Sequence, residues 1–218
     1  MSEVSEDTIQ TVIFAKVPVP GEVKTRLASR IGAVDAARLA EAFLLDTYQS
    51  LETLPWAPPV VATTGPLEGP LSSMHRWIQG GGDLGDRIER MAHRALAGAS
   101  LVILIGADTP GLPLQLLEQA RSALKTCDAV VGPGCDGGFY LLGLRICPEG
   151  LLRGLPWSQS NTLEVLLQRF EHHDLAVHGL PEWFDVDRPE DLDRLANGIG
   201  CGQIIAPVTA KLLAQMDR

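Results

Sequence analysis

Short apolar segments alternate with helix-like segments along almost the whole chain, and this alternation constrains the fold more than any other feature. The apolar segments are β-branched or leucine-rich, which predicts strands at Gln10–Ala15, Pro59–Thr64, Leu101–Ile105, Asp128–Gly132, Phe139–Leu144 and Leu175–Gly179. Apolar residues at helical spacing predict helices at Ala33–Leu54, Leu84–Ala97, Leu114–Lys125, Thr162–His172 and Glu190–Asn197. Apolar strands separated by helices predict an α/β fold, with a mostly parallel sheet between two layers of helices.

The chain of 218 residues reads as a short tail followed by one domain. Residues 1–8 are polar and acidic, and we expect a disordered tail there. Residues 9–218 contain no long linker and no internal repeat, which predicts a single domain. Near the end, Ile204–Met216 suggests a strand-like piece and a C-terminal helix, whose placement the sequence leaves open.

Composition excludes several classes of partner. The net charge of −9 argues against nucleic acid or an anionic membrane surface, but leaves room for a small phosphorylated ligand, because local charge decides that interaction. The sequence shows no signal peptide and no apolar run of transmembrane length, so we expect a cytoplasmic protein. The four cysteines form no CxxC pair, which argues against structural zinc. The oligomeric state stays open.

The segment TVIFAKVPVPGEVKTRL, residues 11–27, joins the first strand to a helix-forming region through a Pro/Gly loop. This loop carries three cations, Lys16, Lys24 and Arg26, in a chain that is acidic overall. Backbone N–H groups, a helix N-terminus and Lys or Arg side chains together suit phosphate groups. The loop therefore predicts a phosphate-binding site, the alternative being a solvated loop that happens to be basic.

Carboxylates occur where strands are expected to end. Asp108 follows the strand Leu101–Ile105, in a turn that the next Pro and Gly already make, so it is less needed as a helix cap. Carboxylate oxygens bind hard divalent cations that bridge to phosphates, which makes Asp108 a candidate metal ligand. Asp185 and Asp187 lie together just before Pro189 and could complete such a site. Alternatively, Asp187 is the N-cap of the following helix.

Two glycine-rich segments lie between these residues. The segment GPGCDGGFY, residues 132–140, predicts a tight hairpin whose glycines allow a ligand to approach the backbone, or simply a turn with no ligand. The segment GGGDLG, residues 80–85, matches GxGxxG but does not follow the first strand, so we interpret it as a loop capped by Asp83 rather than a dinucleotide site. No P-loop and no GxSxG motif occurs.

Five segments occur in an order that resembles a known family: FAKVPVPGEVKTRL, GGDLGDRI, GADTPGLP, GPGCDGGFYLLGL and DVDRPEDL. Together they resemble the small glycosyltransferase-like proteins of the nucleotide-diphospho-sugar transferase (GT-A) superfamily that are associated with radical-SAM proteins and arsenosugar biosynthesis. More distantly, the chain is similar to 2-phospho-lactate guanylyltransferases. Position 106 is Gly, so the full D-x-D of many GT-A enzymes is absent.

The resemblance implies roles for individual residues. Phosphates would be contacted by Lys16, Lys24 and Arg26, and a Mg²⁺ (or Mn²⁺) ion would be held by Asp108 with Asp187 and Asp185. The nucleoside would lie near Gln79, Asp83 and Gly85, and the acceptor or sugar near Asp136, Gly137 and Gly138. The acceptor side would also include Trp157, Ser158, Asn161 and Thr162. The residues closest to the chemistry would be Lys24, Arg26, Asp108 and Asp136.

The function that follows is a metal-dependent transferase with a nucleotide-activated donor, and the closer family favours a glycosyltransferase that uses a nucleotide sugar and an unknown small-molecule acceptor. One alternative is a nucleotidyltransferase that uses a nucleoside triphosphate, because the same fold hosts both reactions. Another is a nucleotide-binding module without catalysis. A nicotinamide dehydrogenase is disfavoured, because the first strand lacks the glycine fingerprint.

Overall fold

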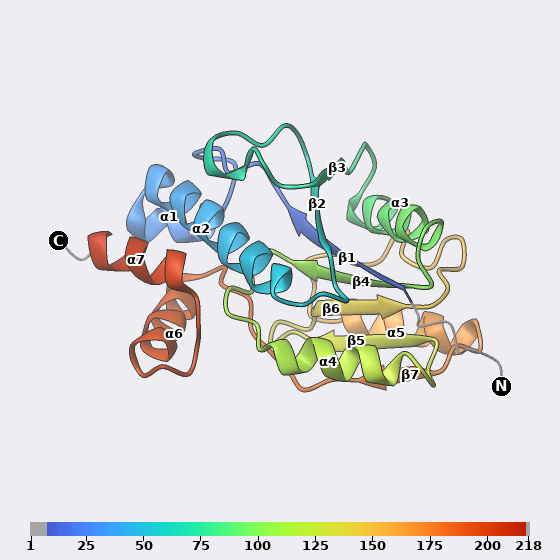
Figure 1. Ribbon diagram of the computed structural model, residues 1–218. Helices are drawn as coiled ribbons and strands as arrows, with labels where there is room; N and C mark the ends of the chain where they lie inside the picture. The colour runs from blue at the N-terminus through green and yellow to red at the C-terminus, as the bar shows by residue number, and fades with distance from the viewer. Residues whose placement is uncertain (1–7, 217–218) are drawn as a thin grey trace.

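The computed structural model describes residues 8–216, so the predicted tail lies outside the described residues except for Thr8. The chain forms one seven-stranded sheet in the order β3-β2-β1-β4-β6-β5-β7 (Figure 1). The strands are β1 (Ile9–Ala15), β2 (Pro59–Thr63), β3 (Arg76–Ile78), β4 (Leu101–Gly106), β5 (Ala129–Pro133), β6 (Phe139–Leu144) and β7 (Val177–Gly179). Only β6 runs antiparallel to its neighbours, which confirms the predicted α/β class and mostly parallel sheet.

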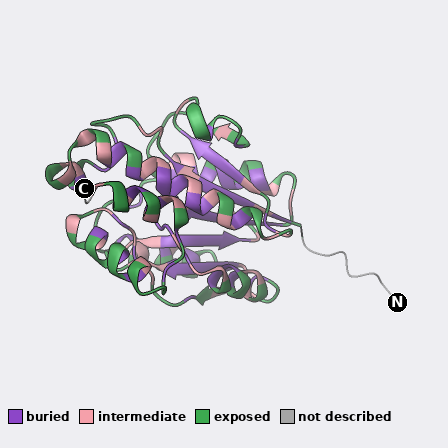
Figure 2. Ribbon diagram, turned by 60° about the vertical axis from the view of Figure 1, so that its left-hand side comes forward, coloured by how far each residue is buried: buried purple, intermediate pink, exposed green. Residues whose placement is uncertain are grey.

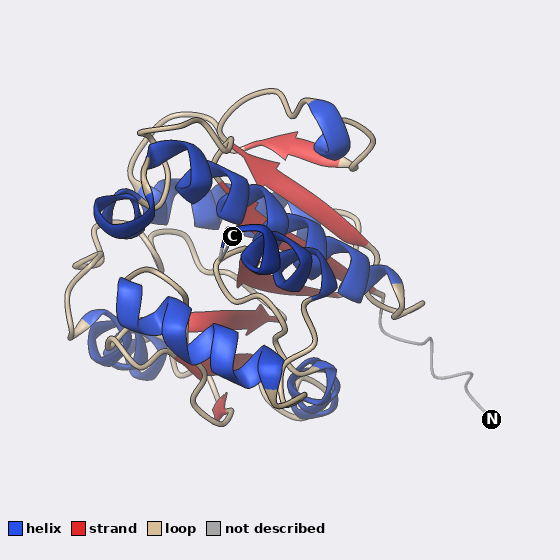
Figure 3. Ribbon diagram, turned by 90° about the vertical axis from the view of Figure 1, so that its left-hand side faces the viewer, coloured by secondary structure: helices blue, strands red, loops and turns tan. Residues whose placement is uncertain are grey.

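Helices lie on both sides of the strands (Figure 3). They are α1 (Thr25–Ile31), α2 (Ala33–Glu52), α3 (Leu84–Leu96), α4 (Leu114–Ala123), α5 (Thr162–His172), α6 (Pro189–Gly200) and α7 (Pro207–Met216), with a 3₁₀ turn η1 at Gly69–Leu71. Within residues 8–216, no helix combines the length and the apolar character that crossing a membrane requires.

The central strands are buried along most of their length, as the uninterrupted apolar runs predict (Figure 2). Their successive side chains point to opposite faces of the sheet. Ile13 of β1 belongs to a core shared with α2 and α4. The preceding residue, Val12, belongs to the core on the other face, shared with α3 and α5. The two cores explain why both layers of helices are needed.

A third apolar cluster joins the C-terminal helices α6 and α7 to α1 and α2. The buried carboxylate of Asp46 on α2 accepts hydrogen bonds from the backbone N–H groups of Val208 and Thr209, both at 2.9 Å. These N–H groups belong to the first turn of α7 and have no partner within that helix. Asp46 thus caps α7 from a neighbouring helix and fixes its position.

The predicted elements differ from the structure mainly at their ends. A helix over residues 33–54 is observed as α2, but a separate helix, α1, precedes it and ends at Gly32, which has φ of 82°. The strand expected from Leu175 begins at Val177. The C-terminal helix is confirmed as α7, whereas the expected strand-like piece at residues 204–206 is wrong, because these residues pair with no strand.

Candidate functional site

The candidate site lies at one edge of the sheet, where the parallel strands end. In Figure 1 the arrowheads of β1, β4 and β5 point toward the side of the molecule where α1 and α6 lie. The loops after β1, β3, β4 and β5 and the segment after β7 all leave the sheet at this edge, because these strands run in one direction. Ligands of open α/β sheets bind at this edge.

Lys24 lies at the centre of this edge and is almost completely buried. Its side chain is 4% exposed, and its Nζ atom lies 2.7 Å from Oδ1 of Asp108. The same Nζ donates a hydrogen bond to the carbonyl of Val186 at 2.7 Å and lies over the ring of Phe43. The backbone of Lys24 is left-handed, with φ of 47°, which costs energy for a residue with a side chain. Lys24 therefore cross-links three segments at the edge.

The segment that contains Asp185 and Asp187 runs beside the turn that contains Asp108. The backbone N–H of Val186 donates to the carbonyl oxygen of Asp108 at 2.8 Å, and this contact fixes the two segments against each other. The carboxylate of Asp108 is 56% exposed, so it faces solvent although its Oδ1 binds Lys24. The structure thus places Lys24 and the segment that contains Asp185 and Asp187, all predicted from the sequence, next to Asp108.

Asp185 lies in a negative environment that other carboxylates share. Burial raises the pKa of Asp185 above its ordinary value, and the negative charge of Asp136 raises this pKa further. Asp108 also raises the pKa of Asp185, whereas the positive charge of Lys24 lowers it. Three carboxylates from different loops therefore share one region, with the ammonium of Lys24 as a counter-charge among them.

Arg26 and Asp187 form an exposed ion pair. Arg26 thus lies at the edge, as predicted, but its guanidinium binds a carboxylate. The alternative interpretation of Asp187 as a helix N-cap is wrong, because α6 begins at Pro189 and the capping carboxylate is that of Asp191. The Oδ2 atom of Asp191 accepts from the backbone N–H groups of Asp187 and Arg188, at 3.1 and 2.7 Å.

Asp108, Asp185 and Asp187 fit a divalent cation only if the ligand and water supply most of the oxygen atoms around it. Among residues 8–216, no three His, Cys, Asp or Glu side chains converge in a ready-made metal site. Magnesium, however, is commonly held by one or two carboxylates while phosphate oxygens and water supply the other ligands. The exposed carboxylate of Asp108, with Asp185 nearby, fits that kind of site. Asp187 fits it less directly, because its carboxylate pairs with Arg26.

The three residues expected near a nucleoside have structural roles in the fold. The buried side-chain amide of Gln79 donates to the carbonyls of Ala15 and Ala62, at 3.1 and 2.7 Å, and so joins the ends of β1 and β2. Asp83 caps α3, as predicted, by accepting from the N–H of Asp86 at 2.9 Å. At Gly85, a Cβ atom would lie 1.9 Å from the carbonyl oxygen of Leu152, so only glycine fits.

Two arginines that the sequence analysis missed hold the glycine-rich loop between β3 and α3. Arg90 donates to the carbonyls of Gln79 and Gly81, and Arg87 donates to that of Gly82. A side chain at Gly80 would meet Arg90 at 2.9 Å, so this glycine makes room for the guanidinium. The three-residue spacing of the arginines on α3 was the available signal, since it places both on one helix face.

The hairpin loop between β5 and β6 packs against the segment expected on the acceptor side. A Cβ atom at Gly137, which has φ of 87°, would lie 2.0 Å from the carbonyl oxygen of Ser160. Gly137 also accepts a hydrogen bond from the N–H of Leu163 at 2.9 Å. The exposed Asp136 accepts from the N–H of Gly138 at 2.8 Å, which fixes the turn. The structure thus brings the two predicted acceptor-side segments together.

The side chains of the segment expected on the acceptor side, residues 157–162, differ in the contacts that they make within the fold. The hydroxyl of Thr162 donates within its own turn, to the carbonyls of Pro156 and Gln159. Trp157 packs edge-on against Phe139, with ring centroids 5.9 Å apart. Asn161 precedes α5 but makes no side-chain capping bond. Thr162 therefore has a structural role, whereas Trp157 packs from the loop before α5 against Phe139, the first residue of β6.

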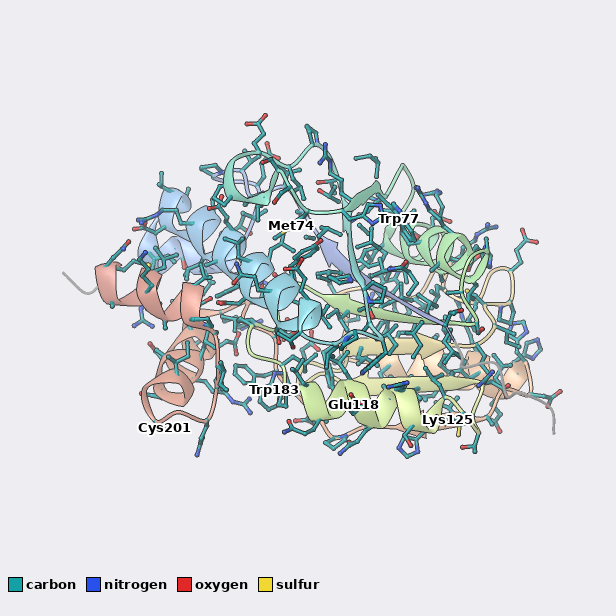
Figure 4. The ribbon with its side chains drawn as sticks, viewed as in Figure 1. Met74, Trp77, Glu118, Lys125, Trp183 and Cys201 are labelled. Atoms are coloured by element: carbon teal, nitrogen blue, oxygen red, sulfur yellow. The ribbon has the colours of Figure 1, made fainter. Side chains whose placement is uncertain are left out.

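A second group of side chains that the sequence analysis missed contacts the hairpin loop between β5 and β6 through Cys135. The thiol of Cys135 contacts Oε1 of Glu182 at 3.0 Å, and Arg194 of α6 lies 3.7 Å from the same sulfur. Arg194 also stacks over the ring of Phe184, at 3.9 Å from the centroid. The neighbouring Trp183 packs between the α2/α4 core and the C-terminal cluster (Figure 4). No sequence motif signals these contacts, because they join segments far apart in the chain.

Comparison with family models gives one match. The model of the family described as uncharacterized proteins conserved in bacteria, DUF2064, matches residues 47–159. No curated protein matches the chain.

Solved structures give more extensive similarity. A candidate nucleotide-diphospho-sugar transferase from Desulfovibrio desulfuricans G20 is 30% identical, with a TM-score of 0.85 over 97% of this chain and 96% of that one. A nucleotidyl transferase from Methanothermobacter is 16% identical, with a TM-score of 0.58 over 89% and 99% of the two chains. Glucosyl-3-phosphoglycerate synthase from Mycobacterium tuberculosis, solved with Mn²⁺ and uridine diphosphate, is 14% identical, with a TM-score of 0.52 over 87% and 76%. The last two similarities show a shared fold.

Proposed function

The chain belongs to the DUF2064 family, and we propose that it is a transferase with a nucleotide-activated donor, specifically a glycosyltransferase that uses a nucleotide sugar. The observation that carries the proposal is the similarity, over nearly the whole chain, to a candidate nucleotide-diphospho-sugar transferase. The placement of acids and cations at the carboxyl edge of the sheet supports it, because that edge is where such folds bind ligands.

Phosphate groups of the donor would lie over the loop after β1. Lys16 is exposed there, and the side chain of Arg26 is 58% exposed, so both can reach a ligand in solution. Arg26 would exchange Asp187 for a phosphate, which it can bind through two parallel hydrogen bonds. We therefore expect Arg26→Ala to weaken binding of a nucleoside diphosphate far more than binding of the nucleoside, as measured by calorimetry. Equal losses would contradict phosphate contact.

Asp108 and Asp185 would hold a divalent cation, Mg²⁺ or Mn²⁺, and Asp187 would orient Arg26 beside them. Such a cation, when bound, stabilises negative charge on phosphate oxygens. Gln79, Asp83 and Gly85 would support the loop against which the nucleoside lies.

The transfer itself would place an acceptor hydroxyl opposite the leaving diphosphate. The acceptor oxygen forms a bond to the anomeric carbon, and the bond from that carbon to the diphosphate oxygen breaks with its electron pair. Asp136, exposed on the hairpin loop, would accept the hydroxyl proton, while Gly137 and Gly138 let the acceptor approach the backbone. Cations of the first loop would stabilise the leaving diphosphate. We place this reaction in the cytoplasm.

The test measures two leaving groups separately. Purified protein is incubated with Mg²⁺ or Mn²⁺ and either a panel of nucleotide sugars or a panel of nucleoside triphosphates, and released nucleoside diphosphate and pyrophosphate are quantified. We expect nucleoside diphosphate release from one nucleotide sugar, lost in Asp108→Asn. Asp193→Asn is the matched control, because it also removes an exposed, ion-paired carboxylate, but on α6 against Arg30.

A specific observation favours a second candidate, nucleotidyl transfer. The turn after β4 offers one carboxylate, Asp108, with Gly106 in place of a second, and the fold is shared with a nucleotidyl transferase. Pyrophosphate release that requires a phosphorylated acceptor, with every nucleotide sugar inert, would move the assignment to this reaction. Tight nucleotide binding with neither product released would indicate a binding module.

A further inference from the structure

The ammonium group of Lys24 is buried, although the carboxylate of Asp108 that balances its charge is exposed. A lysine side chain is rarely buried this far unless a carboxylate balances its charge. Here the balancing group, Asp108, is itself 56% exposed, whereas Lys24 is 4% exposed. The ammonium therefore reaches the carboxylate from the protein side, and the other side of the carboxylate is open to solvent.

The backbone at Lys24 is held in an uncommon conformation for this contact. Its φ of 47° is the left-handed region, and Lys24 is one of three non-glycine residues with positive φ among the described residues. The Val186 carbonyl and the Phe43 ring hold the ammonium in place. Strain of this kind persists only where surrounding contacts over-determine the residue, and it occurs preferentially at functional sites.

We propose that the Lys24 ammonium is the resident counter-ion of Asp108 and that a divalent cation competes with it for this carboxylate. The proposal rests on the proposed function in one respect, namely that Asp108 binds a cation. Lys24 is then not primarily a phosphate ligand. It neutralises the carboxylate when no donor is bound, so that metal binds weakly alone and strongly when donor phosphates add their own oxygen ligands.

The electrostatics of the neighbouring groups support competition. Asp136 and Asp185 add negative charge beside Asp108, and Lys24 supplies opposing positive charge within the same region. Removing that charge leaves the carboxylates without a buried counter-ion, so their affinity for any other cation must rise. A lysine that contacts only phosphate and lies away from Asp108 predicts no such gain, because its charge would not oppose a cation at that carboxylate.

The experiment measures binding of Mn²⁺ alone, by electron paramagnetic resonance, with no nucleotide present. We expect Lys24→Met to bind Mn²⁺ about tenfold more tightly than the wild type, the size expected from removing one charge next to a partly solvated carboxylate. Lys24→Arg keeps the charge and should stay near the wild type. Lys16→Met is the matched control, because it removes an exposed lysine of the same loop, and it should change the affinity less than about twofold.

Unchanged or weaker Mn²⁺ binding in a folded Lys24→Met protein would overturn the proposal, as would an equal gain in Lys16→Met. If Lys24→Met does not fold, hydrogen exchange of the wild type decides the question. Displacement of Lys24 by Mn²⁺ should then accelerate exchange over residues 16–27, and unchanged exchange at saturating Mn²⁺ would refute displacement. Failure of the transferase assay with a tenfold gain in Lys24→Met would refute the proposed reaction alone, since Mn²⁺ binding needs no donor.

Discussion

Removing the Asp46 carboxylate should destabilise the protein through a helix to which Asp46 does not belong. Asp46 is buried on α2, and its two oxygens accept from the first-turn N–H groups of α7. Asp46→Ala leaves the buried N–H of Thr209 without a partner, at a cost of roughly 1–3 kcal/mol. Loss of the second cap, at the half-buried Val208, and of the favourable charge at the helix N-terminus adds roughly 1 kcal/mol. We therefore expect a loss of about 2–4 kcal/mol.

Urea denaturation followed by circular dichroism measures this loss, and the midpoint should fall by about 1 M or more. Asp46→Asn should fall between the wild type and Asp46→Ala, because an amide oxygen accepts but an amide N–H₂ does not. Asp35→Ala is the control, since it removes a carboxylate of the same helix whose ion pair with Arg38 is exposed, and it should cost less than about 1 kcal/mol. If Asp46→Ala matches Asp35→Ala, and amide exchange in α7 is unchanged, the capping argument is refuted.

Three further outcomes follow from burial and close contact. Gly85→Ala should lower the free energy of unfolding by roughly 1–3 kcal/mol or prevent folding, since its Cβ would meet the Leu152 carbonyl oxygen at 1.9 Å, whereas Gly200→Ala, with open space, should be neutral or stabilising in thermal denaturation. Asp185→Asn should raise the urea midpoint at pH 7 in EDTA, because the pKa of Asp185 is raised in the folded protein and its ionisation therefore opposes folding. This gain in the urea midpoint should vanish below the ordinary pKa of 3.8, where the carboxyl is protonated in both states. Burial raises the pKa of Cys147 to about 12, so at pH 8 this thiol should react with Ellman's reagent only in the unfolded protein.

The fold was predictable because the strands are buried on both faces. Apolar runs such as Leu101–Ile105 have no alternating pattern to misread, and glycine and proline mark most of their ends. The helix α1 was less predictable, because it has only seven residues and one buried side chain, Leu27. The short β7 likewise depends on its pairing with β5 rather than on its own composition.

The place of the candidate site was predictable, but its contacts were not. A parallel sheet gathers the residues that follow its strands at one edge, so Lys24, Asp108 and Asp185 were expected near one another. That Lys24 is buried against Asp108 depends on a left-handed backbone and on Val186, which lies 162 residues further along the chain. Sequence periodicity contains no information on such a contact, and the same applies to Arg194 on Cys135.

The contact between Lys24 and Val186 has a consequence for the order in which the protein is made. A ribosome has synthesised most of the chain, including β1 and β4, before the segment around Val186 emerges. Until then the ammonium of Lys24 lacks its carbonyl partner, and the backbone of Asp108 lacks the N–H that holds it. Contacts of such long sequence separation form late, since their loop-closure entropy must be overcome first. Strands β1 to β6 can therefore assemble during translation, whereas the functional edge is completed only after the segment that follows β7 has emerged.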